Sequence, residues 1–195
     1  MTLKRLITQI RFWLFLGNGY KRTKYARKKG IYAEIGEGSK IPSSLPLYPG
    51  LVKIHNNVIM HYSVKLVTHD LINGFLGKIS DTNRFRNIEM FCPIEIFDNV
   101  YIGMNTVILG NVTIGPNVII NAGSLITNDV PPNSIVGGVP AKVIGNLDKY
   151  VKLRIMMDKA MPYELKRSGR ESIDQESIAM IWERFNSKKN KKLAD

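Results

Sequence analysis

The sequence has little that could cross-link the chain or carry it across a membrane. Cys92 is the only cysteine in 195 residues, so no disulfide can form within the chain, and we expect a reducing compartment. No secretory signal is evident, and the longest early apolar run, Phe12 to Leu16, is far too short to span a bilayer. The expected location is therefore the cytoplasm.

Acidic residues are absent from the first 30 positions, which hold nine lysines and arginines. The whole chain carries a formal net charge of +12, and four further lysines lie near its carboxyl end. Such a basic surface favours a nucleic acid, an anionic lipid or a phosphorylated ligand. No nucleic-acid-binding motif accompanies the charge, so we do not expect a nucleic acid partner. A basic surface that only keeps the protein soluble is the alternative.

An isoleucine recurs at every sixth residue through the middle of the sequence. Residues that are small or β-branched follow four places after each isoleucine. A helix would repeat its apolar positions every 3.6 residues and a half-buried strand every two residues, so neither explains a period of six. A short strand followed by a turn, repeated, does fit. The isoleucine series is Ile96, Ile102, Ile108, Ile114, Ile120 and Ile126.

Three such units make a triangular coil of about 18 residues, with one aliphatic residue on each flat side pointing inward. Stacked coils pair as parallel strands and bury a ladder of isoleucine and valine, and the terminal coils need caps. Glycine and asparagine at the corners tolerate left-handed backbone angles. The sequence therefore predicts a mainly β fold, a parallel β-helix over residues 31–146. A β-rich domain with accidental spacing is the alternative.

The two ends of the chain predict helices, and one segment interrupts the repeat. Residues 1–30 form a basic helical lead-in, and residues 147–195 form a helical carboxyl-terminal extension, with one helix expected over 147–160. Regular spacing is lost after Leu71, which predicts an inserted loop at about 72–93. Long loops inside compact folds tend to be functional.

Apolar residues at spacings of three and four predict an amphipathic helix over residues 2–16, which Gly17 and Gly19 would end. The basic residues around this stripe would hold the protein against the inner face of a membrane. The stripe consists of Leu3, Leu6, Ile7, Ile10, Trp13 and Leu14.

Three features together resemble the hexapeptide-repeat acyltransferases. They are the six-residue repeat, the triplet Thr68-His69-Asp70 just before the insertion, and the closing stretch 129–145 with its double proline and Pro-Ala-Lys run. The similarity covers residues 31–146 and lies in the branch of maltose and streptogramin acetyltransferases, close to capsule or lipopolysaccharide O-acetyltransferases. It implies a left-handed β-helix and a homotrimer with active sites at the subunit interfaces. It also implies acetyl-CoA as donor, a sugar or polysaccharide hydroxyl as acceptor, and no metal.

His69 matches the catalytic histidine of the family. An alcohol is a poor nucleophile at neutral pH, and an imidazole, whose unperturbed pKa is about 6.5, can accept its proton as the oxygen attacks the thioester. The imidazolium can then protonate the departing thiolate. Asp70 would orient the imidazole or contact the acceptor, or it would point inward and serve only the structure. A backbone N–H at a nearby corner would hold the oxyanion.

The resemblance also implies where the cofactor binds. The pantetheine arm of acetyl-CoA would pass Gly103, Asn121 and Ala122, because small side chains there let the backbone approach closely. Lys142, in the Pro-Ala-Lys run, would lie near the nucleotide phosphates, where a cation is favourable. A solvated lysine is the alternative.

Asn57 and Arg84 are the candidate contacts to the acceptor, with an ordinary turn role as the alternative for Asn57. The acceptor could also be serine, an antibiotic hydroxyl or a sugar amine. A metal-dependent hydratase of the carbonic anhydrase type needs three histidines on one zinc. His55 and His61 lie one repeat apart, hence on different sides of the triangle, so they would not easily converge with His69. A non-catalytic binding module is the remaining alternative.

Overall fold

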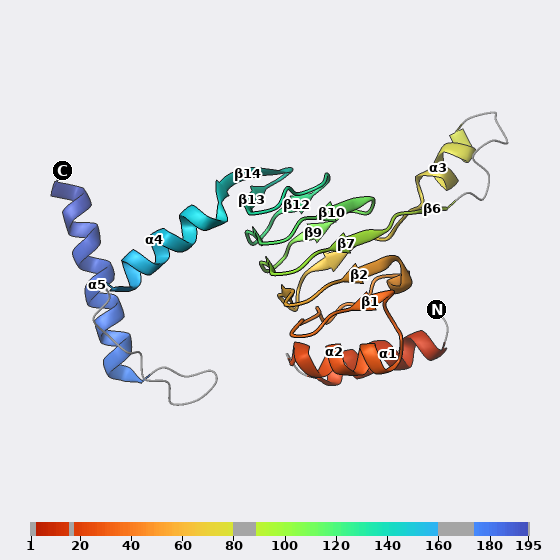
Figure 1. The fold of residues 1–195 in the computed structure, drawn as a ribbon, viewed down its shortest axis with the longest axis horizontal. Helices are drawn as coiled ribbons and strands as arrows, with labels where there is room; N and C mark the ends of the chain where they lie inside the picture. Colours follow the sequence, from red (N-terminus) through yellow and green to blue (C-terminus); the bar gives the residue numbers. More distant parts are fainter. Residues whose placement is uncertain (1–2, 16–17, 80–88, 160–173, 195) are drawn as a thin grey trace. The chain divides into compact units, whose positions relative to one another are not determined.

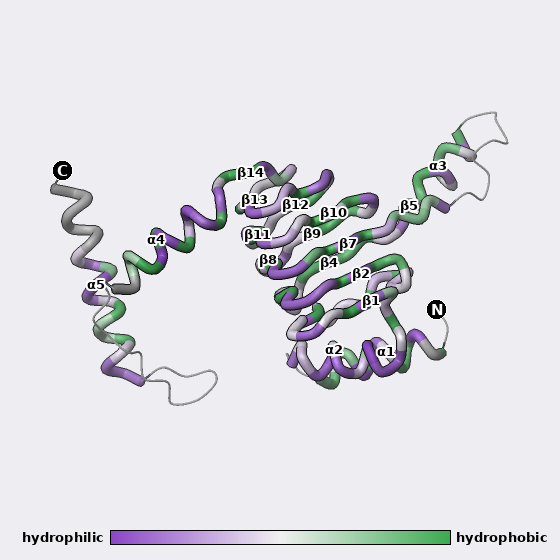
Figure 2. Tube along the Cα trace, viewed as in Figure 1, coloured by the Kyte–Doolittle hydropathy of each residue, from purple (hydrophilic) through white to green (hydrophobic). Residues whose placement is uncertain are grey.

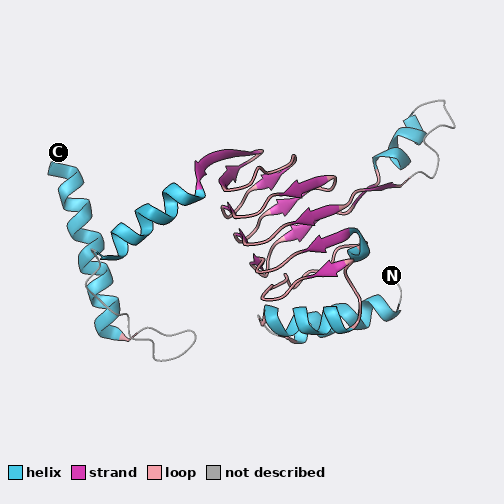
Figure 3. Cartoon of the chain, viewed as in Figure 1, coloured by secondary structure: helices cyan, strands magenta, loops and turns pink. Residues whose placement is uncertain are grey.

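A computed structural model of the protein describes residues 3–15, 18–79, 89–159 and 174–194. The chain divides into two units, Met1–Lys152 and Leu153–Asp195. In the first unit, α1 (Leu3–Leu14) and α2 (Gly19–Lys28) precede a long series of short strands (Figures 1 and 3). Helix α4 (Leu147–Lys159) begins in the first unit and ends in the second, so the helix expected over 147–160 is confirmed. The second unit also contains α5 (Gln175–Ala194).

Most strands come in groups of three, and the three strands of a group belong to three different sheets. Each group is one coil of the chain. The first coil begins at β1 (Glu34–Ile35), and the second has β2 (Val52–Ile54), β3 (Ile59–Met60) and β4 (Lys65–Leu66). The next has β7 (Ile94–Ile96), β8 (Val100–Ile102) and β9 (Val107–Ile108). The last has β10 (Val112–Ile114), β11 (Val118–Ile120) and β12 (Leu125–Ile126).

The coils stack so that corresponding strands pair in parallel and form three flat sides. Side A contains β1 (Glu34–Ile35), β2, β7 and β10; side B contains β3, β8, β11, β13 (Ser134–Gly138) and β14 (Ala141–Asn146); side C contains β4, β9 and β12. Val112 pairs with Ile94 and Val118 with Val100, so successive coils are offset by eighteen residues. The predicted parallel β-helix is confirmed. We name its edges after the sides they join: A–B, B–C and C–A.

The interior of the β-helix is filled by the isoleucine series. All six isoleucines of the series are at most 1% exposed. The residues four places later, such as Val100, Thr106 and Ser124, are buried as well. Hydrophobic and hydrophilic residues alternate along the coils in Figure 2. Because burying one isoleucine side chain stabilises a fold by about 1.5–3 kcal/mol, this ladder is the main support of the β-helix.

Asparagine shapes the corners. Among the described residues other than glycine, six have a positive φ, between 55° and 60°, and all six are asparagines. Asparagine tolerates this left-handed backbone region better than most residues. On the A–B edge, the Asn57 amide donates to Asn99 at 2.8 Å and the Asn99 amide donates to Asn117 at 3.0 Å. The predicted role of asparagine at the corners is therefore confirmed.

The chain leaves the β-helix once, after β4. Strands β5 (His69–Asp70) and β6 (Met90–Phe91) pair antiparallel and form a short stem, and α3 (Ile72–Ile79) follows β5. Val52 pairs with Ile94 across this departure, 42 residues apart instead of eighteen. A helix was not expected here, because Asn73, Gly74 and Gly77 are typical of loops.

Helices α1 and α2 lie against the first coil of the β-helix (Figure 1). The helix predicted over residues 2–16 is observed as α1, which ends at Leu14; Gly17 lies outside the described residues, and Gly19 begins α2. The Asn18 side chain accepts a hydrogen bond from the Lys21 N–H at 3.0 Å and so caps that helix. A Cβ at Gly19 would lie 2.2 Å from Cγ of Lys40, so the glycine leaves room for the Lys40 side chain beside α2.

Arg22 of α2 covers the interior of the first coil. Its side chain is fully buried, and its Nε and one terminal nitrogen donate to the Ile41 carbonyl at 3.3 and 3.2 Å. Burial lowers the pKa of Arg22 and raises the pKa of the neighbouring Tyr32 hydroxyl. With Phe12 of α1, this arginine provides the cap that a terminal coil requires.

The described residues of the second unit are helical. Asp174 accepts a hydrogen bond from the Ser177 N–H at 2.7 Å and caps the start of α5. Trp182 and Phe185 pack edge to face with their ring centroids 5.7 Å apart. In the part of the chain that the structure describes, no helix combines the length and the apolarity that a membrane span requires.

We expect Ile102→Ala to lower the free energy of unfolding by about 2–5 kcal/mol, because Ile102 is fully buried between coils and the substitution leaves a cavity. Urea unfolding followed by circular dichroism measures this. Tyr101→Ala on the same strand is the control, since Tyr101 is 49% exposed. Equal losses in both variants would contradict the proposed importance of the ladder.

Candidate active site

His69 lies where the chain leaves the β-helix at the C–A edge. It is the first residue of β5 and pairs with Phe91 of β6. Thr68, directly before it, is fully buried; its carbonyl accepts from the Cys92 N–H at 2.9 Å, and its hydroxyl accepts from the Tyr48 N–H at 3.2 Å. Both ends of the stem are thus tied to the β-helix, and this fixes the backbone that carries the imidazole.

An aromatic pair lies beside the half-buried His69 imidazole. The Tyr48 ring meets it edge to face with the centroids 5.7 Å apart, and Phe91 packs against Tyr48 at 5.1 Å. The Nδ1 atom of His69 is buried and has no hydrogen-bond partner among the described residues. An unsatisfied buried polar atom costs about 1–3 kcal/mol, so a group from outside the described residues would stabilise it.

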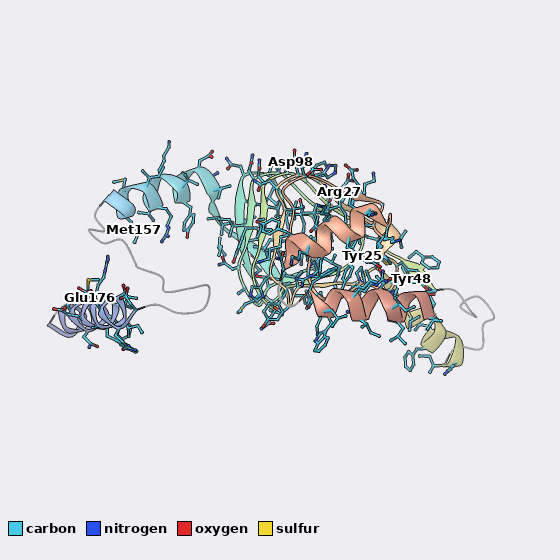
Figure 4. The ribbon with its side chains drawn as sticks, turned by 90° about the horizontal axis from the view of Figure 1, so that it is seen from below. Tyr25, Arg27, Tyr48, Asp98, Met157 and Glu176 are labelled. Carbon is cyan, nitrogen blue, oxygen red and sulfur yellow. The ribbon has the colours of Figure 1, made fainter. Side chains whose placement is uncertain are left out.

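Tyr48 is held in place by Glu89. Its hydroxyl donates to Oε2 of Glu89 at 2.7 Å (Tyr48 is labelled in Figure 4). This hydrogen bond to the carboxylate, with smaller effects of burial and of the negative charge, raises the pKa of Tyr48, so the phenol stays neutral well above neutral pH. The sequence offered no signal for Tyr48, because its role depends on the preceding coil lying beside His69.

Asp70 does not point into the β-helix, which was one of the two roles considered. It is exposed, because β5 has already left the coil, and its Oδ1 accepts a hydrogen bond from the Ile72 N–H at 2.8 Å. The carboxylate therefore supports the first turn of α3. Thr68 occupies the buried position instead.

Three of the four predicted cofactor residues meet on the B–C edge. Gly103 is buried, and a Cβ added to it would lie 2.4 Å from the Ala122 nitrogen and 2.9 Å from the Asn121 carbonyl carbon. Only glycine permits this approach of two coils. Asn121 and Ala122 are exposed, so their backbone lies open beside the corner.

Lys142 continues the same line at the end of the β-helix. It pairs with Gly137 across the antiparallel strands β13 and β14, and a Cβ at Gly137 would lie 3.2 Å from Cβ of Asn121. Small residues and one exposed lysine therefore follow one another along the B–C edge. This arrangement fits an extended ligand with phosphates at one end, so the residues present are compatible with acetyl-CoA.

The predicted acceptor residue Asn57 is not brought to His69 within one chain. Asn57 lies on the A–B edge, where its φ of 55° and its bond to Asn99 give it a turn role. Arg84 lies outside the described residues. Side C separates the B–C edge, with Gly103, from the C–A edge, with His69.

The three histidines follow three different sides of the same coil. His55 follows β2, His61 follows β3, and His69 follows β4. The His55 Nε2 lies 2.9 Å from Oε1 of Glu95, and its ring stacks on Phe97 at 5.0 Å. Because they occupy three separate edges, the histidines of one chain do not converge on one ion.

A groove of about 380 Å³ runs along side A near the C–A edge. Lys53 and Glu95 line it together with Asp129. Oδ1 of Asp129 accepts a hydrogen bond from the Thr113 N–H at 2.7 Å, and this bond lowers the pKa of the carboxyl. The carboxylate of Asp129 therefore holds two coils together.

Residues 93–128 match the family model described as bacterial transferase hexapeptide, six repeats. The chain thus contains the repeat of the bacterial hexapeptide transferases, and the predicted resemblance to hexapeptide-repeat acyltransferases is confirmed.

Among curated proteins, the chain is 48% identical over 98 residues to galactoside O-acetyltransferase of Escherichia coli (strain K12), which is 50% of this chain and 45% of that protein. It is 43% identical over 102 residues to Protein CapG of Staphylococcus aureus, 52% of this chain and 56% of that protein. The chain spans about half the length of the curated relatives it matches.

Two solved acetyltransferase structures are also similar to the chain. A galactoside acetyltransferase in complex with coenzyme A is 27% identical, with a TM-score of 0.51, over 87% of this chain and 88% of that chain. A maltose O-acetyltransferase from Clostridium difficile 630 is 26% identical, with a TM-score of 0.51, over 66% of this chain and 75% of that chain.

We expect Gly103→Ala to lower the free energy of unfolding by roughly 1–3 kcal/mol, because the new Cβ forces two coils apart. Urea unfolding measures the loss. Gly50→Ala is the matched control, since a Cβ there meets nothing within 4 Å. If both variants unfold at the same urea concentration as the unsubstituted protein, the close approach at Gly103 is not a constraint.

Proposed function

We propose that the protein is an acetyl-CoA-dependent O-acetyltransferase that transfers the acetyl group to a hydroxyl of a sugar or polysaccharide precursor. The observation that carries the proposal is the position of His69. It is a half-buried imidazole on an anchored stem, in a chain whose coils carry the hexapeptide transferase repeat. Relatives named galactoside and maltose O-acetyltransferase support the choice of a sugar hydroxyl.

In the proposed reaction, acetyl-CoA supplies a thioester whose carbonyl carbon is attacked by the acceptor hydroxyl. His69 accepts the hydroxyl proton as the new C–O bond forms, and it returns that proton to the sulfur as the C–S bond breaks. Because Nδ1 is buried, we assign both transfers to Nε2. The Tyr48 ring, which packs on Phe91, holds the imidazole in one orientation.

We further infer that the active site is completed by a second copy of the chain in a homotrimer. One observation supports this: side C separates His69 from the proposed cofactor residues Gly103, Asn121, Ala122 and Lys142. A neighbouring protomer would bring its B–C edge to His69.

Several finer assignments belong to this proposal. We take the coil to be left-handed, and we take 31–146 as the catalytic domain between the lead-in 1–30 and the extension 147–195. The insertion at about 72–93, with Arg84, and Asn57 from a neighbouring copy are the proposed acceptor contacts. Asp70 acts indirectly, through its support of α3. The reaction takes place in the cytoplasm.

We expect His69→Ala to lower acceptor-dependent thiol release from acetyl-CoA by roughly 10²–10⁴-fold, since the general base is lost. The measurement offers the protein acetyl-CoA with a panel of sugars and glycans, and with serine and an amino sugar as further acceptors. A thiol reagent detects the coenzyme A that is released. Lys28→Gln is the control and should keep its rate, because Lys28 is an exposed residue of α2 outside the proposed site. Full thiol release by His69→Ala would overturn the role of His69. Binding of a glycan without any thiol release would indicate a non-catalytic binding module.

A further inference from the structure

Helix α1 is attached to the β-helix by polar side chains and one phenylalanine. The Arg5 guanidinium donates to the carbonyls of residues 45–47 at 2.8–3.1 Å. The Gln9 amide donates to the Ser43 carbonyl at 3.0 Å and accepts from the Leu45 N–H at 3.1 Å. Phe12 is fully buried. These positions lie four and three residues apart, so they form one face of the helix.

The apolar stripe of α1 faces away from the β-helix and is exposed. A stripe of large apolar residues on a helix usually packs against the core of a protein. Here the six side chains are between 39% and 73% exposed, and Trp13 alone is 67% exposed. The stripe consists of Leu3, Leu6, Ile7, Ile10, Trp13 and Leu14.

Lysines occupy the outward face of the neighbouring helix. Lys21, Lys24 and Lys28 of α2 are exposed and lie three and four residues apart, opposite the buried Arg22 and Ala26. Both helices lie side by side against the β-helix (Figure 4). The lysines of α2 and the stripe of α1 both lie on exposed faces, opposite the buried residues of their helices.

The two helices also form a shared groove of about 480 Å³. Leu3 and Ile7 line it from α1, and Tyr25 and Lys29 line it from α2 and the residue that follows. The Arg11 guanidinium lies 5.5 Å above the Tyr25 ring and donates to its hydroxyl at 3.1 Å. Apolar and cationic groups are therefore interleaved on one surface.

We propose that α1 and α2 form a docking surface for an anionic lipid bilayer. The stripe of α1 enters the interface between headgroups and acyl chains, and Lys21, Lys24 and Lys28 bind the lipid phosphates. Amphipathic helices with this combination lie in the plane of a membrane, and each lysine near an anionic surface adds to the affinity.

A lipid surface fits this face better than a second copy of the same face does. Residues 1–30 contain no acidic side chain, so two such faces would bring lysines against lysines. Arg27 is paired with Glu37, which leaves the exposed lysines of α2 as the cations that face outward. The phosphates of a bilayer provide the complementary charge.

The test uses the full chain with Trp182→Phe, so that Trp13 is the one remaining tryptophan. We expect Trp13 fluorescence to shift to shorter wavelength, and the protein to sediment with vesicles, when phosphatidylglycerol is present at low salt. Vesicles of phosphatidylcholine alone should bind much less protein. Failure to bind phosphatidylglycerol vesicles even at low salt would overturn the proposal.

Two pairs of substitutions separate the apolar and the charge contributions. Ile7→Gln with Ile10→Gln should weaken binding roughly 30-fold, because two exposed isoleucines lose their place in the interface. Lys24→Gln with Lys28→Gln should weaken it roughly 25-fold, at about fivefold per lysine, and should reduce the dependence on salt.

The matched controls lie on α4. Val151→Gln with Ile155→Gln replaces exposed apolar residues, and Lys149→Gln with Lys152→Gln removes exposed charges. Both should leave vesicle binding unchanged, and an equal loss in the controls would overturn the assignment of the surface. A Trp13 shift on concentrating the protein without vesicles would instead assign the stripe to a second copy. Thiol release with a soluble acceptor should persist in all these variants, so the test stands apart from the proposed function.

Discussion

The burial of one isoleucine per flat side is the constraint on which the rest of the structure depends. Ile114, Ile120 and Ile126 lie on the isoleucines eighteen residues earlier in the series, one pair on each side, and this stacking sets the parallel register of all three sheets. Many of the corners turn through a residue with left-handed backbone angles, and asparagine supplies this conformation at six positions. The repeat therefore fixes the position of every residue in a coil, since a shift of the chain by one residue would move a buried isoleucine out of the core.

The fixed register of the coils positions the candidate active site. His69 sits where the chain leaves the coil, and the coil below supplies Tyr48, whose backbone N–H and ring reach Thr68 and His69. Gly103 allows the coils at the B–C edge to approach closely, which leaves the backbone of Ala122 exposed beside it. The candidate functional residues of this fold lie at corners and where the chain departs from the repeat, because the flat sides are occupied by inward-facing apolar residues and by strand pairing.

The amino-terminal end of the β-helix has to be covered by residues outside the repeat. An open coil exposes apolar side chains and unpaired backbone groups, so it has to be covered. Here Arg22, Phe12 and the polar face of α1 provide that cover, and the apolar face of α1 is left outside. The stripe is thus exposed because the opposite, polar face of α1 is the one that covers the first coil. It gives the amino-terminal region a surface whose chemistry is unlike that of the β-helix.

The sequence by itself determined the period of six, the parallel β-helix and the inward positions, because a repeat of apolar residues has only one way to bury them all. It also placed His69 beside the insertion, and it brought Gly103, Asn121 and Ala122 to one edge through the eighteen-residue offset. Only the tertiary structure decided that Asp70 turns outward to support α3, that Gly19 begins a helix, and that Tyr48 and Glu89 flank the histidine. These features depend on contacts between residues far apart in the chain, and such contacts leave no local pattern to read.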